Sequence, residues 1–231
     1  LAARSGEPLP NKPVLLTFDD GYASFYHEIF PLLRRFGYPA VMALVGRWLE
    51  AAPGSQVIYG NASLKPREHF LEASQIIEMT ESGLVEFASH TYDLHHGVIG
   101  NPQQNLQPAA VTRIYLNDQQ LYESDVQYRQ RIISDLRRNH QLLERLTGRT
   151  PRTLVWPYGA WSIEAENIAR ELGYEFFLTL GNYPHLADST GRIGRSLIER
   201  NPVVADIKYN LENLNSAEPV RAAHVDLDYV Y

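Results

Sequence analysis

Residues 13–21 read PVLLTFDDG, an apolar run that stops at two adjacent aspartates and a glycine. An unbroken apolar run bounded by turn residues predicts a buried strand over residues 13–18. Apolar side chains then recur at a helical period through residues 25–36, so the strand leads into a helix. This strand-and-helix unit recurs along the rest of the chain.

The chain alternates between short apolar runs and segments of helical period. The further strands that we expect are 40–45, 84–88, 152–156, 174–180, 193–198 and 220–230, and the further helices are 66–82, 123–146, 162–172 and 203–214. Such alternation predicts an α/β fold with a parallel sheet and right-handed crossovers. We expect a (β/α)-barrel-like sheet of about seven parallel strands, with a doubly wound open sheet as the alternative. In either fold, ligands bind at the carboxyl ends of the strands.

Two stretches, residues 46–65 and 96–122, show no clear period, and we expect both to be irregular. The second is longer than the usual connection between elements, and loops of that length are usually functional. Because it directly follows a strand end rich in histidine, we expect it to flank the site.

The composition is that of a globular protein and excludes several classes of function. The 231 residues carry 21 Lys and Arg against 27 Asp and Glu, a net charge of −6. This acidic balance argues against a nucleic-acid partner, because such binding depends on cationic side chains. The absence of cysteine excludes disulfides, a thiol nucleophile and a Cys-ligated metal. No apolar run approaches the ~18 residues of a transmembrane helix.

Two carboxylates, Asp19 and Asp20, stand at the end of the first predicted strand. At close range they repel one another, and the pKa of one rises unless a cation lies between them. A divalent metal would resolve the repulsion, with one aspartate as its ligand and the other free to act as a base. An ordinary strand-to-helix turn with an aspartate N-cap is the alternative.

Two other strand ends carry residues suited to chemistry. Residues 89–96 read SHTYDLHH, so His90 ends a strand and His95 or His96 could return to the same centre. Two histidines and one carboxylate form a metal site that leaves coordination positions open, whereas a polar surface loop is the alternative. Residues 155–159 read VWPYG, which could present a backbone N–H to an oxyanion or could simply end a strand.

Taken together, these three strand ends resemble the polysaccharide deacetylases, the NodB-homology or carbohydrate esterase family 4 proteins. That family carries Thr-Phe-Asp-Asp-Gly, then His-(Ser/Thr)-x-x-His, then Arg-x-Pro-Tyr-Gly. There are two departures here: Leu94 takes the second histidine position with His95 after it, and Val155 replaces the arginine that orients the catalytic base. These two departures, together with the ending HVDLDYVY at 224–231, make the chain resemble one subgroup of the family, the PgaB-type poly-β-1,6-N-acetyl-D-glucosamine N-deacetylases of biofilm export.

The resemblance implies roles for individual residues. Asp20, His90 and His95 would hold one divalent transition metal, either Zn, Ni, Co or Fe, and Asp19 would be the general base. The residues implied at the oxyanion and the sugar are Tyr158, Pro157, Trp156, Tyr92 and Trp161. The general acid is not assigned: the resemblance places it in an upstream strand of a circularly permuted fold, and His224 is the candidate only if the chain is complete.

The resemblance also implies a setting for the enzyme. Residues 1–219 would be the deacetylase domain without its N-terminal part, and 220–231 would open a second, glycoside-hydrolase-like domain. The expected substrate is an acetylated β-linked glucosamine polymer, with an outer-membrane export porin as a partner. The expected location is the periplasm, with an N-terminal attachment to the outer membrane. The alternatives are a deacetylase of chitin, peptidoglycan or xylan, and a non-catalytic sugar-binding relative.

Overall fold

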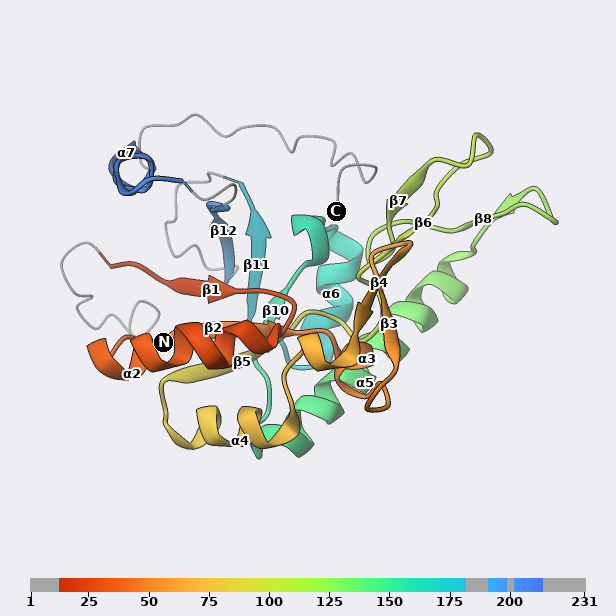
Figure 1. Ribbon diagram of the computed structural model, residues 1–231. Coiled ribbons are helices and arrows are strands. Elements are labelled where there is room, and N and C mark those ends of the chain that lie inside the picture. The colour runs from red at the N-terminus through yellow and green to blue at the C-terminus, as the bar shows by residue number, and fades with distance from the viewer. Residues whose placement is uncertain (1–12, 182–190, 199–201, 214–231) are drawn as a thin grey trace.

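The computed structural model describes residues 13–181, 191–198 and 202–213. Its centre is a parallel sheet of six strands in the order β1-β2-β5-β10-β11-β12. These strands are Leu16–Phe18, Ala40–Leu44, Val85–Ser89, Thr153–Val155, Phe176–Leu180 and Arg192–Arg195. Each new strand adds beside the previous one, so the sheet winds in one direction and curls into a half-barrel (Figure 1). The order never reverses about a central strand, which excludes the doubly wound alternative.

Helices connect successive strands and cover the outer face of the sheet. They are a π-helical turn at Phe25–Ile29, α2 Phe30–Phe36, α4 Ala73–Glu81, α5 Asp125–Thr147 and α6 Ile163–Glu171, and α7 Val204–Asn213 follows the last described strand. Ser124 caps the start of helix α5, and its side chain forms a capping box with Gln127. The helix predicted over 66–82 starts only at Ala73, because the chain before it forms a strand end and a 3₁₀ turn. Among the described helices, none has the length and apolar character needed to cross a membrane.

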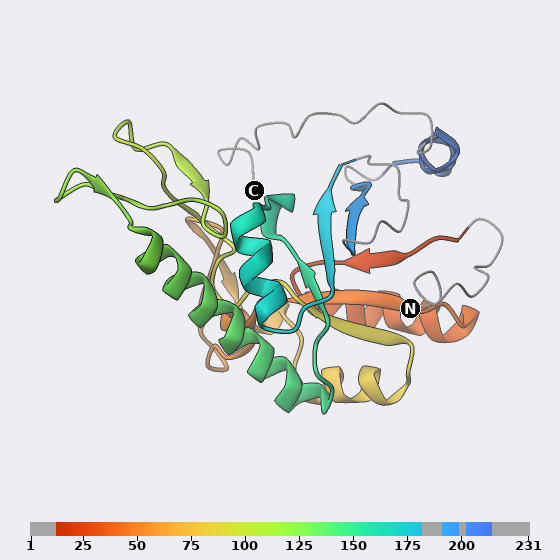
Figure 2. The same cartoon turned by 180° about the vertical axis from the view of Figure 1, so that it is seen from behind.

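Both faces of the inner strands β2, β5, β10 and β11 are largely buried, which is why these strands appear in the sequence as mainly apolar runs. Helices α5 and α6 lie side by side over β10 and β11 (Figure 2), and their core includes Leu136 and Phe177. Helices α2 and α4 cover the other half of the sheet through residues such as Met42. The opposite face, inside the curled sheet, is filled by Val41, Ala43, Ala88, Val155 and Leu178.

The two stretches expected to be irregular contain short hairpins. After helix α3, Gly46–Leu49, come β3 Gln56–Tyr59 and β4 Ser63–Pro66. The longer stretch holds two hairpins, made of β6 Gly97–Ile99 with β7 Leu106–Pro108 and β8 Tyr115–Leu116 with β9 Leu121–Tyr122. Both of these hairpins project away from the sheet (Figure 1). The predicted strand over 220–230, and the domain expected from 220, lie outside the described residues.

Candidate metal centre and active site

The first strand ends in a sharp turn that fixes the two aspartates. Asp20 has a φ of 75° and Gly21 a φ of 73°, so two consecutive residues are left-handed. Few residues with a side chain adopt this conformation, and those that do gather at functional sites. At Gly21 a Cβ atom would also lie 2.7 Å from the Leu44 side chain, so the turn requires glycine there. The turn brings the Asp20 carboxylate toward the histidines that follow β5.

Asp20, His90 and His95 lie together as the sequence predicts for a metal site. The Asp20 Oδ1 atom is 3.6 Å from the His90 Nε2 atom and 3.3 Å from the His95 Nε2 atom. All three ligand atoms lie within 4.8 Å of one another. The Asp20 Oδ1 atom is buried and has no hydrogen-bond partner. A buried, unpartnered oxygen that faces two imidazole nitrogens is costly without a cation, so these residues fit a divalent transition metal.

The two imidazoles are held in the form that binds metal. The His90 Nδ1 atom lies 2.7 Å from the Val155 carbonyl oxygen, so it carries the proton and leaves the Nε2 lone pair toward Asp20. Burial lowers the pKa of His95 to about 4, although the Asp20 charge opposes the shift, so His95 is neutral at pH 7. The His96 Nδ1 atom instead lies 3.0 Å from the Gly97 carbonyl oxygen, and His96 is not part of the cluster.

A partly buried carboxylate beneath the histidine loop supports it from helix α5. The Asp135 Oδ1 and Oδ2 atoms accept the backbone N–H groups of Tyr92 and Asp93, at 2.8 and 2.7 Å. Burial raises the pKa of Asp135 to about 7, against the effect of these two hydrogen bonds. Asp135 was not predicted from the sequence; the available signal was a single aspartate among the buried apolar residues of an amphipathic helix.

Asp19, the expected base, lies beside the cluster and pairs with an arginine from the far edge of the sheet. Its Oδ2 atom is 3.9 Å from the His90 Nε2 atom. The Arg195 Nη1 and Nη2 atoms donate to its two oxygens at 2.7 and 2.8 Å. Burial would raise the pKa of Asp19, but the charge of His90 when that imidazole is protonated, together with the hydrogen bond and charge of Arg195, outweighs burial and holds this pKa below its usual value. Arg195, which ends β12, was not predicted from the sequence.

Only one of the five residues expected at the oxyanion and the sugar lies against the metal cluster. Tyr158 has a φ of 58°, and its hydroxyl lies 3.3 Å from the His95 Nδ1 atom. Pro157 is buried beside it. Trp156 is 0% exposed and stacks on Phe177 in the core, so its assignment to the substrate is wrong.

The two remaining aromatic residues are engaged elsewhere. The Tyr92 ring is covered by the Arg138 guanidinium at 3.8 Å, and its hydroxyl donates to Glu50. The Arg192 guanidinium lies 3.6 Å from the centre of the Trp161 ring. One face of each ring is therefore already occupied by a cation. His224, the conditional general acid, lies outside the described residues.

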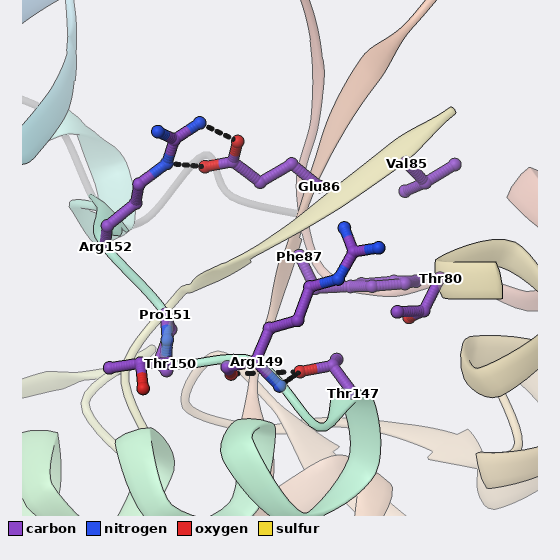
Figure 3. Close-up of a pocket in the computed structure, with 9 residues that line it drawn as sticks. All are labelled: Thr80, Val85, Glu86, Phe87, Thr147, Arg149, Thr150, Pro151 and Arg152. Atoms are coloured by element: carbon purple, nitrogen blue, oxygen red, sulfur yellow. Dashed lines mark hydrogen bonds and ion pairs between the residues drawn. The ribbon is translucent and has the colours of Figure 1, made fainter. Parts of the chain in front are cut away.

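Two hollows flank opposite parts of the sheet. One of about 210 Å³ adjoins the cluster at His95, and its other walls include Trp48, Asn61, Asp93 and His96. The other, of about 170 Å³, lies at the amino ends of β5 and β10 (Figure 3). Since parallel strands carry their carboxyl ends to one edge, this second hollow is at the end remote from the cluster. It contains the Glu86–Arg152 ion pair.

The sequence matches the model of one protein family, Polysaccharide deacetylase, over residues 6–177. It is 41% identical to the poly-β-1,6-N-acetyl-D-glucosamine N-deacetylase of Escherichia coli K12 over the whole chain, but spans only 34% of that protein. Among solved structures, the deacetylase domain of BpsB from Bordetella bronchiseptica is 45% identical with a TM-score of 0.81, over 85% of this chain and 75% of that one.

A de-N-acetylase from Aggregatibacter actinomycetemcomitans is 38% identical with a TM-score of 0.82, over 90% of this chain and 78% of that one. The match to the family model includes Asp19, Asp20, His90, His95 and Tyr158. The chain therefore belongs to the polysaccharide deacetylase family.

Proposed function

We propose that this chain is a metal-dependent N-deacetylase that removes acetyl groups from poly-β-1,6-N-acetyl-D-glucosamine. The names of the relatives in Escherichia coli support this substrate. The observation that carries the proposal is the unpartnered Asp20 Oδ1 atom, which faces two imidazole nitrogens beside a second carboxylate. A binding module needs no such arrangement of ligands and base.

The residues of the site have separate roles in amide hydrolysis. When Asp20, His90 and His95 bind a divalent metal, it supplies Lewis-acid polarisation of the acetamide carbonyl and acidifies water. Asp19 accepts the proton of the attacking water as general base, and its pairing with Arg195 keeps it ionised and oriented. The Tyr158 backbone N–H serves the oxyanion that develops on the carbonyl oxygen.

We also propose a location, a set of candidate metal ions and a division into domains. We place the enzyme in the periplasm, attached to the outer membrane and working beside an export porin, because its substrate is an exported polymer. We propose that the ion is Zn, Ni, Co or Fe, all of which suit an oxygen and two imidazole ligands. We also propose that residues 1–219 form the deacetylase domain and that 220–231 begin a glycoside-hydrolase-like domain.

The test is acetate release with and without a chelator. We expect release from β-1,6-linked N-acetylglucosamine oligomers, its loss with chelator and its return when metal is added. Chitin oligomers, peptidoglycan fragments and acetylxylan serve as competing substrates. Faster release from any of these would replace the proposed substrate. Chelator-resistant release, or no release from any substrate by the full-length protein, would overturn the proposed enzyme.

A further inference from the structure

Tyr59, the last residue of β3, contacts the metal cluster from outside the sheet. Its hydroxyl donates to the Asp20 Oδ2 atom at 2.7 Å. The other oxygen of the same carboxylate, Oδ1, is the unpartnered atom that faces the two histidines. The two oxygens of Asp20 are therefore distinguished: one is held by a phenol and one is left for a cation.

This division restricts how Asp20 can bind a metal. To bind a cation through both oxygens, Asp20 would have to turn Oδ2, which accepts from Tyr59, toward the cation as well as Oδ1. The Tyr59 hydroxyl opposes this, because it donates to Oδ2 at 2.7 Å and would have to give up that hydrogen bond or bend it. With one oxygen from Asp20 and one nitrogen from each histidine, three protein ligands leave positions open for water and substrate.

The Tyr59 ring is fixed in place by its neighbours. It stacks on Trp48, with ring centres 4.9 Å apart, and the Trp48 Nε1 atom donates to the Ile58 carbonyl oxygen at 3.1 Å. Lys65 lies on the paired strand β4, and its ammonium is 4.8 Å from the centre of the Tyr59 ring. The Tyr59 ring is also 5.6 Å from that of His95. The hairpin thus presents the hydroxyl from a rigid support.

We propose that Tyr59 is a positioning residue that keeps Asp20 a one-oxygen ligand and thereby sets both the affinity and the coordination number of the metal. This inference rests on the metal site of the proposed function. It adds to that site a residue that none of the three strand-end motifs contains. Groups that hold metal ligands from behind are commonly worth ~10–100-fold in metal affinity.

The test compares metal binding by the full-length protein and its Tyr59→Phe variant, measured by competition with a chromophoric chelator for Zn²⁺ and by the absorption spectrum with Co²⁺. We expect Tyr59→Phe to weaken Zn²⁺ binding ~10–100-fold. We also expect the visible Co²⁺ bands to lose intensity, because a second Asp20 oxygen raises the coordination number. Tyr26→Phe is the matched control, since it removes a tyrosine–carboxylate hydrogen bond, to Glu78, on the exposed surface.

A second variant separates the hydroxyl from the packing of the hairpin. Lys65→Met removes the cation above the ring and keeps the Tyr59 hydroxyl, so we expect affinity close to that of the wild type. Equal losses in Lys65→Met and Tyr59→Phe, or an unchanged Zn²⁺ affinity in Tyr59→Phe, would overturn the inference. If the wild type itself binds no metal, the metal site of the proposed function fails instead, so the two failures are distinguishable.

Discussion

The two ends of the sheet each carry an arginine that grips a carboxylate with two nitrogens. At the carboxyl end, Arg195 holds Asp19 at 2.7 and 2.8 Å. At the amino end, the Arg152 Nε and Nη2 atoms hold Glu86 at 3.1 and 2.5 Å (Figure 3). By their hydrogen bonds alone the two pairs are alike, although Arg195 is 10% exposed and Arg152 is 34% exposed.

The surroundings of the two pairs differ, and that difference identifies the site. Glu86 receives one more donor, the Thr153 hydroxyl, and the pair ties neighbouring strands together. Asp19 instead lies beside two imidazoles and a second carboxylate with an unpartnered oxygen. A satisfied ion pair stabilises a fold, whereas an unsatisfied ligand set implies a missing partner. Variants at the two ends should therefore separate chemistry from stability.

The largest effect should come from removing a metal ligand. We expect Asp20→Ala or His90→Ala to abolish bound metal, measured by elemental analysis, and with it acetate release. The reason is that two remaining ligands hold a divalent ion weakly. His96→Ala is the matched control, because His96 lies one residue beyond His95 and outside the cluster. Full metal occupancy in both ligand variants would falsify the ligand set.

Replacing the base should come next and should leave the metal in place. Asp19→Asn keeps the size of the side chain but cannot accept the proton of water. We expect turnover to fall ~10²–10⁴-fold, the usual contribution of a positioned general base. Glu86→Gln, the equivalent change at the amino end, should leave turnover unaltered. Near-normal turnover in Asp19→Asn would reduce Asp19 to a turn residue.

The two arginines give the most direct comparison of the two ends. We expect Arg195→Met to lower kcat by about 100-fold, because a base displaced by about 1 Å costs this much. Without the guanidinium the pKa of Asp19 rises, so the acid limb of the pH–rate profile should move to higher pH. Arg152→Met should leave kcat and the profile unchanged. The same loss in both variants, with no change in profile, would mean that Arg195 only stabilises the fold.

The sequence alone predicted the strands and the site residues that lie next to them in the chain. Asp19, Asp20 and His90 directly follow apolar runs, so the strand that positions each of them is visible beside it. The single winding direction of the sheet followed from the same alternation, with the open sheet left as an alternative. The described part of the chain has six sheet strands where about seven were expected, and the strand over 220–230 lies outside it.

What the sequence could not predict comes from distant parts of the chain or from short elements. Arg195 is 176 residues from Asp19, and only the curl of the sheet brings its two edges together. Tyr59 lies on a hairpin whose four-residue strands are too short for a period to be recognised. The resemblance placed Trp156 at the substrate along with the rest of its motif, but side chains alternate along a strand. With Val155 inside the curled sheet, Trp156 faces the helices.

The smallest predicted effect concerns the support beneath the site. The pKa of Asp135 is raised by burial to about 7 in the folded protein, against 3.8 in a free aspartate. The folded state therefore holds this proton more tightly than the unfolded state, and the stability so gained is complete below pH 3.8 and is lost as the pH rises through 7. We expect the melting temperature of the metal-free protein to fall over this range by several degrees more than that of Asp135→Asn.

The comparison is made between wild type and variant at each pH, because other groups titrate in both proteins and cancel. Asp135→Asn also loses part of the hydrogen bonding to the Tyr92 and Asp93 amides, which lowers its stability by the same amount at every pH. That constant loss does not affect the slope of melting temperature against pH. Asp125→Asn, at the exposed start of the same helix, should keep the slope of the wild type. If the melting temperatures of wild type and Asp135→Asn change with pH in parallel, the two amide hydrogen bonds keep this carboxylate ionised throughout. It then supports the histidine loop as an anion rather than as an acid.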